Sequence, residues 1–213
     1  MPVEKVCVVG MGPGAEDYLI PLARKKIEEA DVLVGSPRLT GLFPGKEARG
    51  LDFSGEPPTT VSYILENRQR KRIAVLVSGD PGLYSFLGVL ARYLRPEEYE
   101  IVPGISSVQL AFARLKESWE DAFIHSVHGR KLDGLIEVVK QHPKVALLTD
   151  GRLSPREIAL YLRAGGIEDR EMVVCSDLSY PGERVTRLDM EAAGPQAEDK
   201  GNYVMIIRGK RSC

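Results

Sequence analysis

The chain has 213 residues, of which 43% are hydrophobic and 28% charged, an ordinary composition for a soluble protein with one large or two small domains. Its formal net charge of −1 argues against a broad nucleic-acid-binding surface. No apolar run reaches about 18 residues and the N-terminus lacks a signal-peptide pattern, so we expect a cytoplasmic protein without membrane contact. The three cysteines show no metal-binding spacing, which indicates a reducing environment and no metal site.

The N-terminal segment has the pattern of a strand, a glycine loop and a helix. Residues 3–10 form the expected strand, GMGPG at residues 10–14 the loop, and residues 15–30 the helix. A dinucleotide fingerprint requires G-x-G-x-x-G, whereas this loop reads G-x-G-x-G, and Pro13 lacks an N–H for binding a pyrophosphate. Arg38, near the start of a short helix, could pair with an NADP phosphate and leaves an NADP-dependent oxidoreductase as an alternative.

The segment IAVLVSGDPG, residues 73–82, contains an unbroken apolar run typical of a parallel strand that helices cover on both faces. Gly79 and Asp80 follow at its carboxyl end, where open α/β sheets bind ligands. As an alternative, Asp80 caps the next helix. A further strand at residues 99–102 also ends in a glycine loop, residues 103–107. Three such loops at one edge of a sheet predict a cleft for a small molecule.

The remaining pattern predicts an α/β fold with two α/β domains. Strands are also expected at residues 31–35, 51–53, 122–127, 144–149, 172–177, 183–188 and 202–208, the last two as an antiparallel pair. Helices are expected at residues 36–43, 59–70, 83–94, 108–115 and 133–141, and after Ser154. The polar interval KESWED, residues 116–121, is the expected linker between an N-terminal domain, residues 1–115, and a C-terminal domain, residues 122–213.

Few side chains suggest catalysis by the protein itself. The sequence has no nucleophile elbow, no HExxH motif and no P-loop lysine. His125 and His128 fall on opposite faces of a strand, which argues against a metal pair. His128 and Arg130 are better candidates for binding an anionic substrate. A glycine-lined cleft with small residues and a few cationic side chains suits a reaction whose reactive group comes with a cofactor.

Six segments together resemble the tetrapyrrole methylase family: VVGMGPG, SGDPG, VPGISSVQLAFARL, HGR, LLTDGRLSP and SYPGERV. The first two mark the wider family. PGISSVQLAFARL, HGR and LTDGRLSP point to members that methylate carbon 5 of a cobalt-precorrin, a polycarboxylate tetrapyrrole, in cobalamin biosynthesis. The resemblance spans nearly the whole chain. It implies two α/β domains with S-adenosylmethionine in the cleft between them, and a homodimer.

The resemblance also implies roles for individual residues. Carried over by position, those near the cofactor are Pro13, Gly79, Asp80, Ser106, Ser107 and Thr149. Thr149 stands where relatives often have a methionine. Pairing of cations with carboxylates assigns substrate binding to Arg38, His128, Arg130 and Arg152. No catalytic side chain is assigned, because an electron-rich ring carbon attacks the sulfonium methyl directly once the two are aligned.

The chain ends at Cys213 without a second methyltransferase module. We therefore expect it to supply only the carbon 5 step and to need a partner enzyme that methylates carbon 15 and decarboxylates. Within the family, the alternatives are another ring carbon or a non-tetrapyrrole substrate such as ribosomal RNA or diphthine; the near-neutral charge disfavours RNA. A non-catalytic nucleotide-binding scaffold is the remaining alternative.

Overall fold

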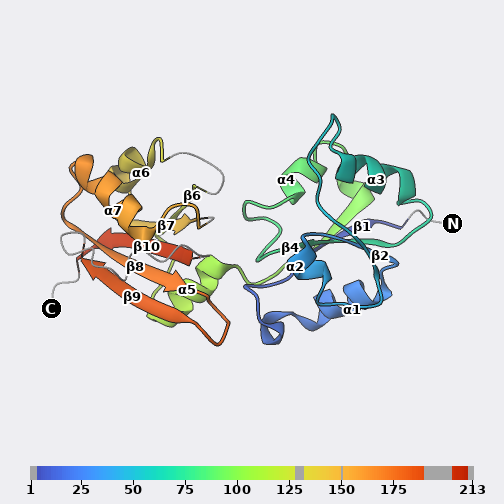
Figure 1. The fold of residues 1–213 in the computed structure, drawn as a ribbon, viewed down its shortest axis with the longest axis horizontal. Coiled ribbons are helices and arrows are strands. Elements are labelled where there is room, and N and C mark those ends of the chain that lie inside the picture. Colours follow the sequence, from blue (N-terminus) through green and yellow to red (C-terminus); the bar gives the residue numbers. More distant parts are fainter. Residues whose placement is uncertain (1–3, 128–131, 150, 190–202, 211–213) are drawn as a thin grey trace. The chain divides into compact units, whose positions relative to one another are not determined.

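The computed structural model describes residues 4–127, 132–149, 151–189 and 203–210. The chain separates into two compact units, Met1–Ser106 and Ser107–Cys213. Each unit is built on its own five-stranded sheet (Figure 1). No helix among the described residues is long and apolar enough to cross a membrane.

The sheet of the first unit is parallel throughout, with strand order β3-β2-β4-β1-β5. Its strands are β1 (Val6–Gly10), β2 (Val32–Val34), β3 (Glu47–Arg49), β4 (Ile73–Val77) and β5 (Tyr99–Val102). Every residue of β1, β2 and β4 is buried, as expected for parallel strands covered on both faces. The strand expected at residues 51–53 was wrong. The edge strand is β3 instead, and its exposed EAR sequence has no apolar pattern that would reveal it.

Alternate residues of a strand point to opposite faces of the sheet, so the fully apolar strands β1, β2 and β4 present apolar side chains on both faces. Helices cover both faces. Helices α3 (Thr59–Asn67) and α4 (Leu87–Leu90) pack on one face. Helices α1 (Pro21–Glu29) and α2 (Pro37–Thr40) pack on the other (Figure 1). The helix expected over residues 15–30 starts as a separate 3₁₀ turn, Glu16–Tyr18, before a proline opens α1.

The helix expected over residues 83–94 is much shorter than its apolar spacing suggests. Tyr84 adopts a φ of 47°, which a right-handed helix does not allow. The Ser85 hydroxyl then accepts a hydrogen bond from the Leu87 N–H at 3.1 Å, a local bond that competes with helix formation. Only the four residues of α4 are therefore helical in this segment.

The second unit has a mixed sheet with strand order β6-β7-β10-β8-β9. Its strands are β6 (Phe123–Ser126), β7 (Lys144–Leu148), β8 (Arg170–Ser176), β9 (Arg184–Asp189) and β10 (Tyr203–Gly209). The expected direct pairing of the last two strands was wrong, because β8 lies between them and pairs antiparallel with both. β10 lies at the centre of the sheet, and six consecutive residues of this strand are buried. β9 lies at the edge and is largely exposed.

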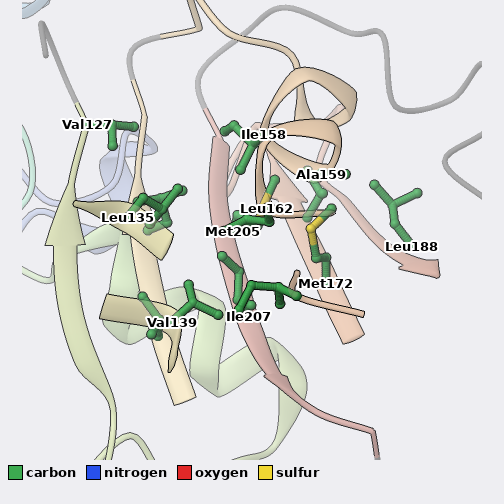
Figure 2. Packing of buried hydrophobic residues seen from close by; sticks show 14 of the residues in the cluster. Val127, Leu135, Val139, Ile158, Ala159, Leu162, Met172, Leu188, Met205 and Ile207 are labelled. Atoms are coloured by element: carbon green, nitrogen blue, oxygen red, sulfur yellow. The ribbon is translucent and has the colours of Figure 1, made fainter. Parts of the chain in front are cut away.

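Two helices, α6 (Leu135–Gln141) and α7 (Pro155–Ala164), cover one face of the second sheet. Figure 2 shows Leu162 of α7 close to Met205, and Val139 of α6 close to Ile207. The expected cap of α7 is confirmed. Ser154 accepts a hydrogen bond from the Glu157 N–H at 3.2 Å, and the Glu157 carboxylate accepts one from the Ser154 N–H at 2.7 Å.

Helix α5 (Ser107–Leu115) belongs with the second unit, whereas the sequence analysis placed it before a linker at residues 116–121. Its buried side chains include Ala111 and Phe112, and it packs against β10. Glu117, just after the helix, forms a buried ion pair with Arg208 of β10. The division therefore falls before α5, and the polar interval connects α5 to β6 within the second unit.

Candidate functional site

Three loops meet at the carboxyl edge of the first sheet. They follow β4, β1 and β5, which are neighbours in that order. A Cβ atom added to Gly10 would lie 2.5 Å from the Gly104 nitrogen and 2.8 Å from the Gly79 carbonyl oxygen. A Cβ atom added to Gly104 would lie 2.3 Å from that same oxygen. The three loops therefore pack backbone against backbone, which only glycine permits at these positions.

The loops after β1 and β4 are also joined by backbone hydrogen bonds. The Gly79 N–H donates to the Gly12 carbonyl at 2.9 Å, and the Gly12 N–H donates to the Gly79 carbonyl at 3.3 Å. Both glycines have a positive φ, 72° at Gly12 and 68° at Gly79, which other residues rarely adopt. This antiparallel bridge holds Pro13, the next residue along the chain, beside the second loop.

Asp80 links the second and third loops through its side chain. Its Oδ1 accepts from the Gly82 N–H at 2.8 Å, and its Oδ2 accepts from the Gly104 N–H at 3.1 Å. The alternative that Asp80 caps the next helix was wrong, because α4 begins only at Leu87. Buried Ser106 completes the group, since a Cβ atom added to Gly79 would lie 3.5 Å from its Cα. We call this arrangement, residues 10–13, 78–82 and 103–106, the three-loop cluster.

Arg38 lies beside the three-loop cluster. It is an exposed residue of α2, the helix that follows β2, and β2 pairs with β4. Its Nη2 donates to the hydroxyl oxygen of Ser78 at 3.4 Å. The first unit thus brings together five of the predicted site residues: Pro13, Arg38, Gly79, Asp80 and Ser106.

The other predicted residues lie elsewhere in the chain. Ser107 is the first residue of α5. Thr149 follows β7, half-buried, and its hydroxyl donates to the Tyr203 carbonyl at 2.9 Å. Arg152 is exposed between β7 and α7. His128 and Arg130 fall outside the described residues.

Sequence reasoning missed the contact between Gly10 and Gly104. Each glycine stands at or just beyond the end of a strand, but this pattern alone cannot reveal which loops touch. It also missed the bond from Gly104 to Asp80, which is 24 residues away in the chain. Among the described residues there is no group of three or more His, Cys, Asp or Glu side chains arranged to hold a metal ion.

A cavity of about 450 Å³ opens at the opposite, amino edge of the first sheet. Charged side chains around it include Lys26, Arg72 and Glu100. Lys26 is paired with Glu100, and Arg72 is paired with Asp31 at 2.7 Å, so these charges are already compensated. None of the predicted site residues lines this cavity, whereas five of them lie in or beside the three-loop cluster, which we take as the candidate site.

Comparison with known proteins identifies the family. Residues 5–194 match the model of the Tetrapyrrole (Corrin/Porphyrin) Methylases. The chain belongs to this family. This methylase is 36% identical over 200 residues to cobalt-precorrin-7 C(5)-methyltransferase of Salmonella typhimurium, an alignment that covers 94% of this chain and 97% of that protein. It is 32% identical to precorrin-6Y C(5,15)-methyltransferase [decarboxylating] of Sinorhizobium sp over 84% of this chain and 43% of that protein.

A solved structure has the same fold. The crystal structure of a cobalamin biosynthesis precorrin-6Y methylase from Archaeoglobus fulgidus matches with a TM-score of 0.72 and 26% identity, over 98% of this chain and 99% of that chain. The expectation of two α/β domains of the tetrapyrrole methylase type is confirmed. The expected enzyme class is confirmed as well: the chain is a methyltransferase that uses S-adenosylmethionine.

The three-loop cluster fits this cofactor. Its glycines let three loops pack backbone against backbone, so that small residues gather at the edge where α/β sheets bind ligands. The Asp80 carboxylate supplies a negative charge suited to the sulfonium and ammonium groups of S-adenosylmethionine.

Proposed function

We propose that this methylase transfers the methyl group of S-adenosylmethionine to carbon 5 of cobalt-precorrin-7 in cobalamin biosynthesis. The three-loop cluster is the structural observation that supports the proposal, since it gathers three glycine-containing loops at the edge where α/β sheets bind ligands. The 36% identity to the Salmonella typhimurium enzyme, along nearly the full length of both chains, supports the choice of substrate and ring carbon.

The residues of this chain act mainly by binding and orienting. When bound, the cofactor supplies a methyl group made electrophilic by the sulfonium. Pro13, Gly79 and Ser106 hold the cofactor against rigid backbone, so that little freedom remains to be lost when the reacting atoms align. Ser107 and Thr149 are proposed as further cofactor contacts. Closely packed loops also limit the access of water to the bound cofactor.

Cationic side chains are proposed to bind the carboxylates of the tetrapyrrole. Arg38 is the best placed in the first unit, because it is exposed and its guanidinium reaches Ser78 of the three-loop cluster. A guanidinium binds a carboxylate through two parallel hydrogen bonds. Arg152 is exposed in the second unit. His128 and Arg130, which lie outside the described residues, complete the proposed set.

Association with other chains is part of the proposal. The Sinorhizobium enzyme, of which this chain matches 43%, is named for methylation at carbons 5 and 15 and for decarboxylation. We propose that a separate protein performs the carbon 15 step for the present methylase. A homodimer and a cytoplasmic location, both expected from the sequence, remain proposals.

Two measurements test the function. Calorimetric titration with S-adenosylhomocysteine should show micromolar binding. Incubation with ¹³C-methyl S-adenosylmethionine and cobalt-precorrin-7 should place one label at carbon 5, as read by NMR. A label at another ring carbon would assign the chain a different methylation, and absence of cofactor binding would overturn the proposal.

Variants of Arg38 test the substrate contact separately. Arg38→Ala should raise the KM for the tetrapyrrole about tenfold, the value of one charge-assisted contact, and leave S-adenosylhomocysteine affinity unchanged. Arg70→Ala is the matched control, because Arg70 is exposed just before the amino end of β4. Equal KM values for the two variants would remove Arg38 from the substrate site.

A further inference from the structure

The Asp80–Gly104 bond joins the loops that follow β4 and β5, two strands that are not neighbours in the sheet. β1 lies between β4 and β5 in the sheet, so the two outer loops must cross its end to meet. They cross at Gly10, where an added Cβ atom would lie 2.8 Å from both the Gly79 carbonyl oxygen and the Gly104 Cα. Over this point the Asp80 Oδ2 accepts the Gly104 N–H at 3.1 Å. One side chain thus spans the whole three-loop cluster.

The two oxygens of Asp80 have separate partners. Oδ1 closes the local turn by accepting from the Gly82 N–H at 2.8 Å, and Oδ2 makes the bond between loops. Both partners are donors, and a carboxylate has two acceptor oxygens. An asparagine can satisfy only one of them, because its NH₂ group would face the other N–H. The position therefore requires an acidic residue for reasons internal to the protein.

We infer that Asp80 is a positioning residue, which sets the geometry of the cofactor site by holding the loop at residues 103–106 against the loop at residues 78–82. This deepens the proposed function and rests on it. A hydrogen bond to a carboxylate is about twice as strong as a neutral one, so it fixes the third loop before the cofactor arrives. A loop that is already ordered loses less conformational freedom on binding, which raises affinity. Asp80 acts in this way through the Gly104 backbone.

The test separates this bond from the local turn. Asp80→Asn has one acceptor oxygen for the two N–H groups, so it cannot keep both the turn and the bond to Gly104. Asp80→Ser retains a short hydroxyl for the turn and cannot reach the third loop. The control is Asp52→Asn, because the Asp52 Oδ1 accepts from the Ser54 N–H at 2.9 Å in an equivalent turn of the same unit.

Two readouts are expected to change together. S-adenosylhomocysteine affinity should fall about 10- to 100-fold in both Asp80 variants, the range for one charge-assisted hydrogen bond, and change less than about twofold in Asp52→Asn. Hydrogen exchange of the Gly104 amide, followed by NMR in the absence of ligand, should accelerate only in the Asp80 variants. The KM for S-adenosylmethionine should rise more than kcat falls.

The remaining outcomes would overturn the inference in distinguishable ways. Weaker binding with unchanged Gly104 exchange would mean that Asp80 contacts the cofactor directly and does not act by positioning. Faster exchange with unchanged affinity would make the bond purely structural. Failure of the unsubstituted chain to bind S-adenosylhomocysteine would refute the proposed function itself, and this is known before any variant is compared.

Discussion

The hydroxyl of Thr149 donates a hydrogen bond to the backbone carbonyl oxygen of Tyr203 at 2.9 Å. The Tyr203 hydroxyl in turn donates to the Leu153 carbonyl at 2.6 Å. Together the two bonds tie the segment between β7 and α7 to the start of β10. Because its hydrogen is already used, the Thr149 hydroxyl can serve a ligand only as an acceptor.

This bond predicts different effects for two substitutions of Thr149. Thr149→Val should lower the free energy of unfolding by about 1 kcal/mol, the typical net value of one hydrogen bond, whereas Thr149→Ser should retain most of it. Urea denaturation measures the difference. If Thr149 also contacts the cofactor, Thr149→Val should weaken S-adenosylhomocysteine binding and Thr149→Ser should not. Equal affinities in both variants would leave Thr149 with the structural role alone.

Close packing of the loops makes Gly10 sensitive to a single added methyl group. Gly10→Ala places its Cβ within 2.8 Å of two neighbouring loops and should lower the free energy of unfolding by about 1–3 kcal/mol. It should also weaken S-adenosylhomocysteine binding, because the loops must move apart. The control is Gly88→Ala, where nothing lies within 4 Å of the added Cβ and stability should rise by up to about 1 kcal/mol. Unchanged binding by Gly10→Ala would show that the loops tolerate separation.

The contacts within the three-loop cluster show how much of the fold and of the candidate site the sequence predicts. Uninterrupted apolar runs located β1 and β4, because burial on both faces removes the alternation of apolar and polar residues along the strand. Glycine at the strand ends predicted three loops gathered at one edge of the sheet, and these loops do pack together there. The bond between Asp80 and Gly104 left no signature along the chain, since it depends on strand order, which local patterns do not encode.

Two predictions about the fold that differ from the structure have the same origin. The pairing of β9 and β10 was inferred from their adjacency in the sequence, but β8 takes the place between them. Helix α5 was assigned to the first unit because the polar segment after it resembles a linker. Its position is decided by packing against β10 and by the ion pair between Glu117 and Arg208, both of them contacts distant in sequence.

The buried Arg208 is predicted to stabilise the second unit strongly. Its guanidinium pairs with Glu117 and bonds the Glu171 carboxylate at 2.9 and 3.0 Å, and its side chain is only 5% exposed. Burial acts to lower the pKa of Arg208, but the hydrogen bonds to Glu117 and Glu171 outweigh it and raise that pKa. Arg208→Leu should lower the free energy of unfolding by about 3–5 kcal/mol, because it leaves two carboxylates poorly solvated.

Arg187 provides the control for this prediction. It bonds the same Glu171 at 3.2 Å, but its side chain is 54% exposed. Arg187→Leu should therefore cost no more than about 1 kcal/mol. Urea unfolding of both variants gives the comparison, and similar losses in the two would contradict the special role of the buried arginine.

An ion pair in the first unit predicts a loss of stability in acid. Hydrogen bonds from the Arg72 side chain and backbone lower the pKa of Asp31 to about 2, from an ordinary value of 3.8. A lowered pKa stabilises the fold above about pH 4, and this contribution is lost as the pH falls toward 2. Asp31→Asn should flatten the pH dependence of unfolding in that window. Since both side chains are exposed, high salt should reduce the effect, and a variant with the same slope as the unsubstituted chain would contradict the prediction.

The two buried thiols predict slow alkylation at near-neutral pH and a loss of stability in alkali. Burial raises the pKa of Cys7 and of Cys175 to about 12 from 9.0, and Glu100 and Glu183 respectively add to the effect. At pH 8 both thiols are therefore protonated and shielded from solvent. In a Cys213→Ser background, iodoacetamide should modify the native protein very slowly and the urea-unfolded protein quickly.

The same raised pKa values fix the direction of the pH dependence. A thiol that must stay protonated in the native state gives its full stabilisation below pH 9 and loses it as the pH rises toward 12. The free energy of unfolding should fall in this window by at most about 1.4 kcal/mol per pH unit for each thiol. Replacing either cysteine by alanine should remove its share of the slope. Rapid alkylation of the native protein at pH 8 would show that the thiols are accessible, and the alkaline slope would then need another origin.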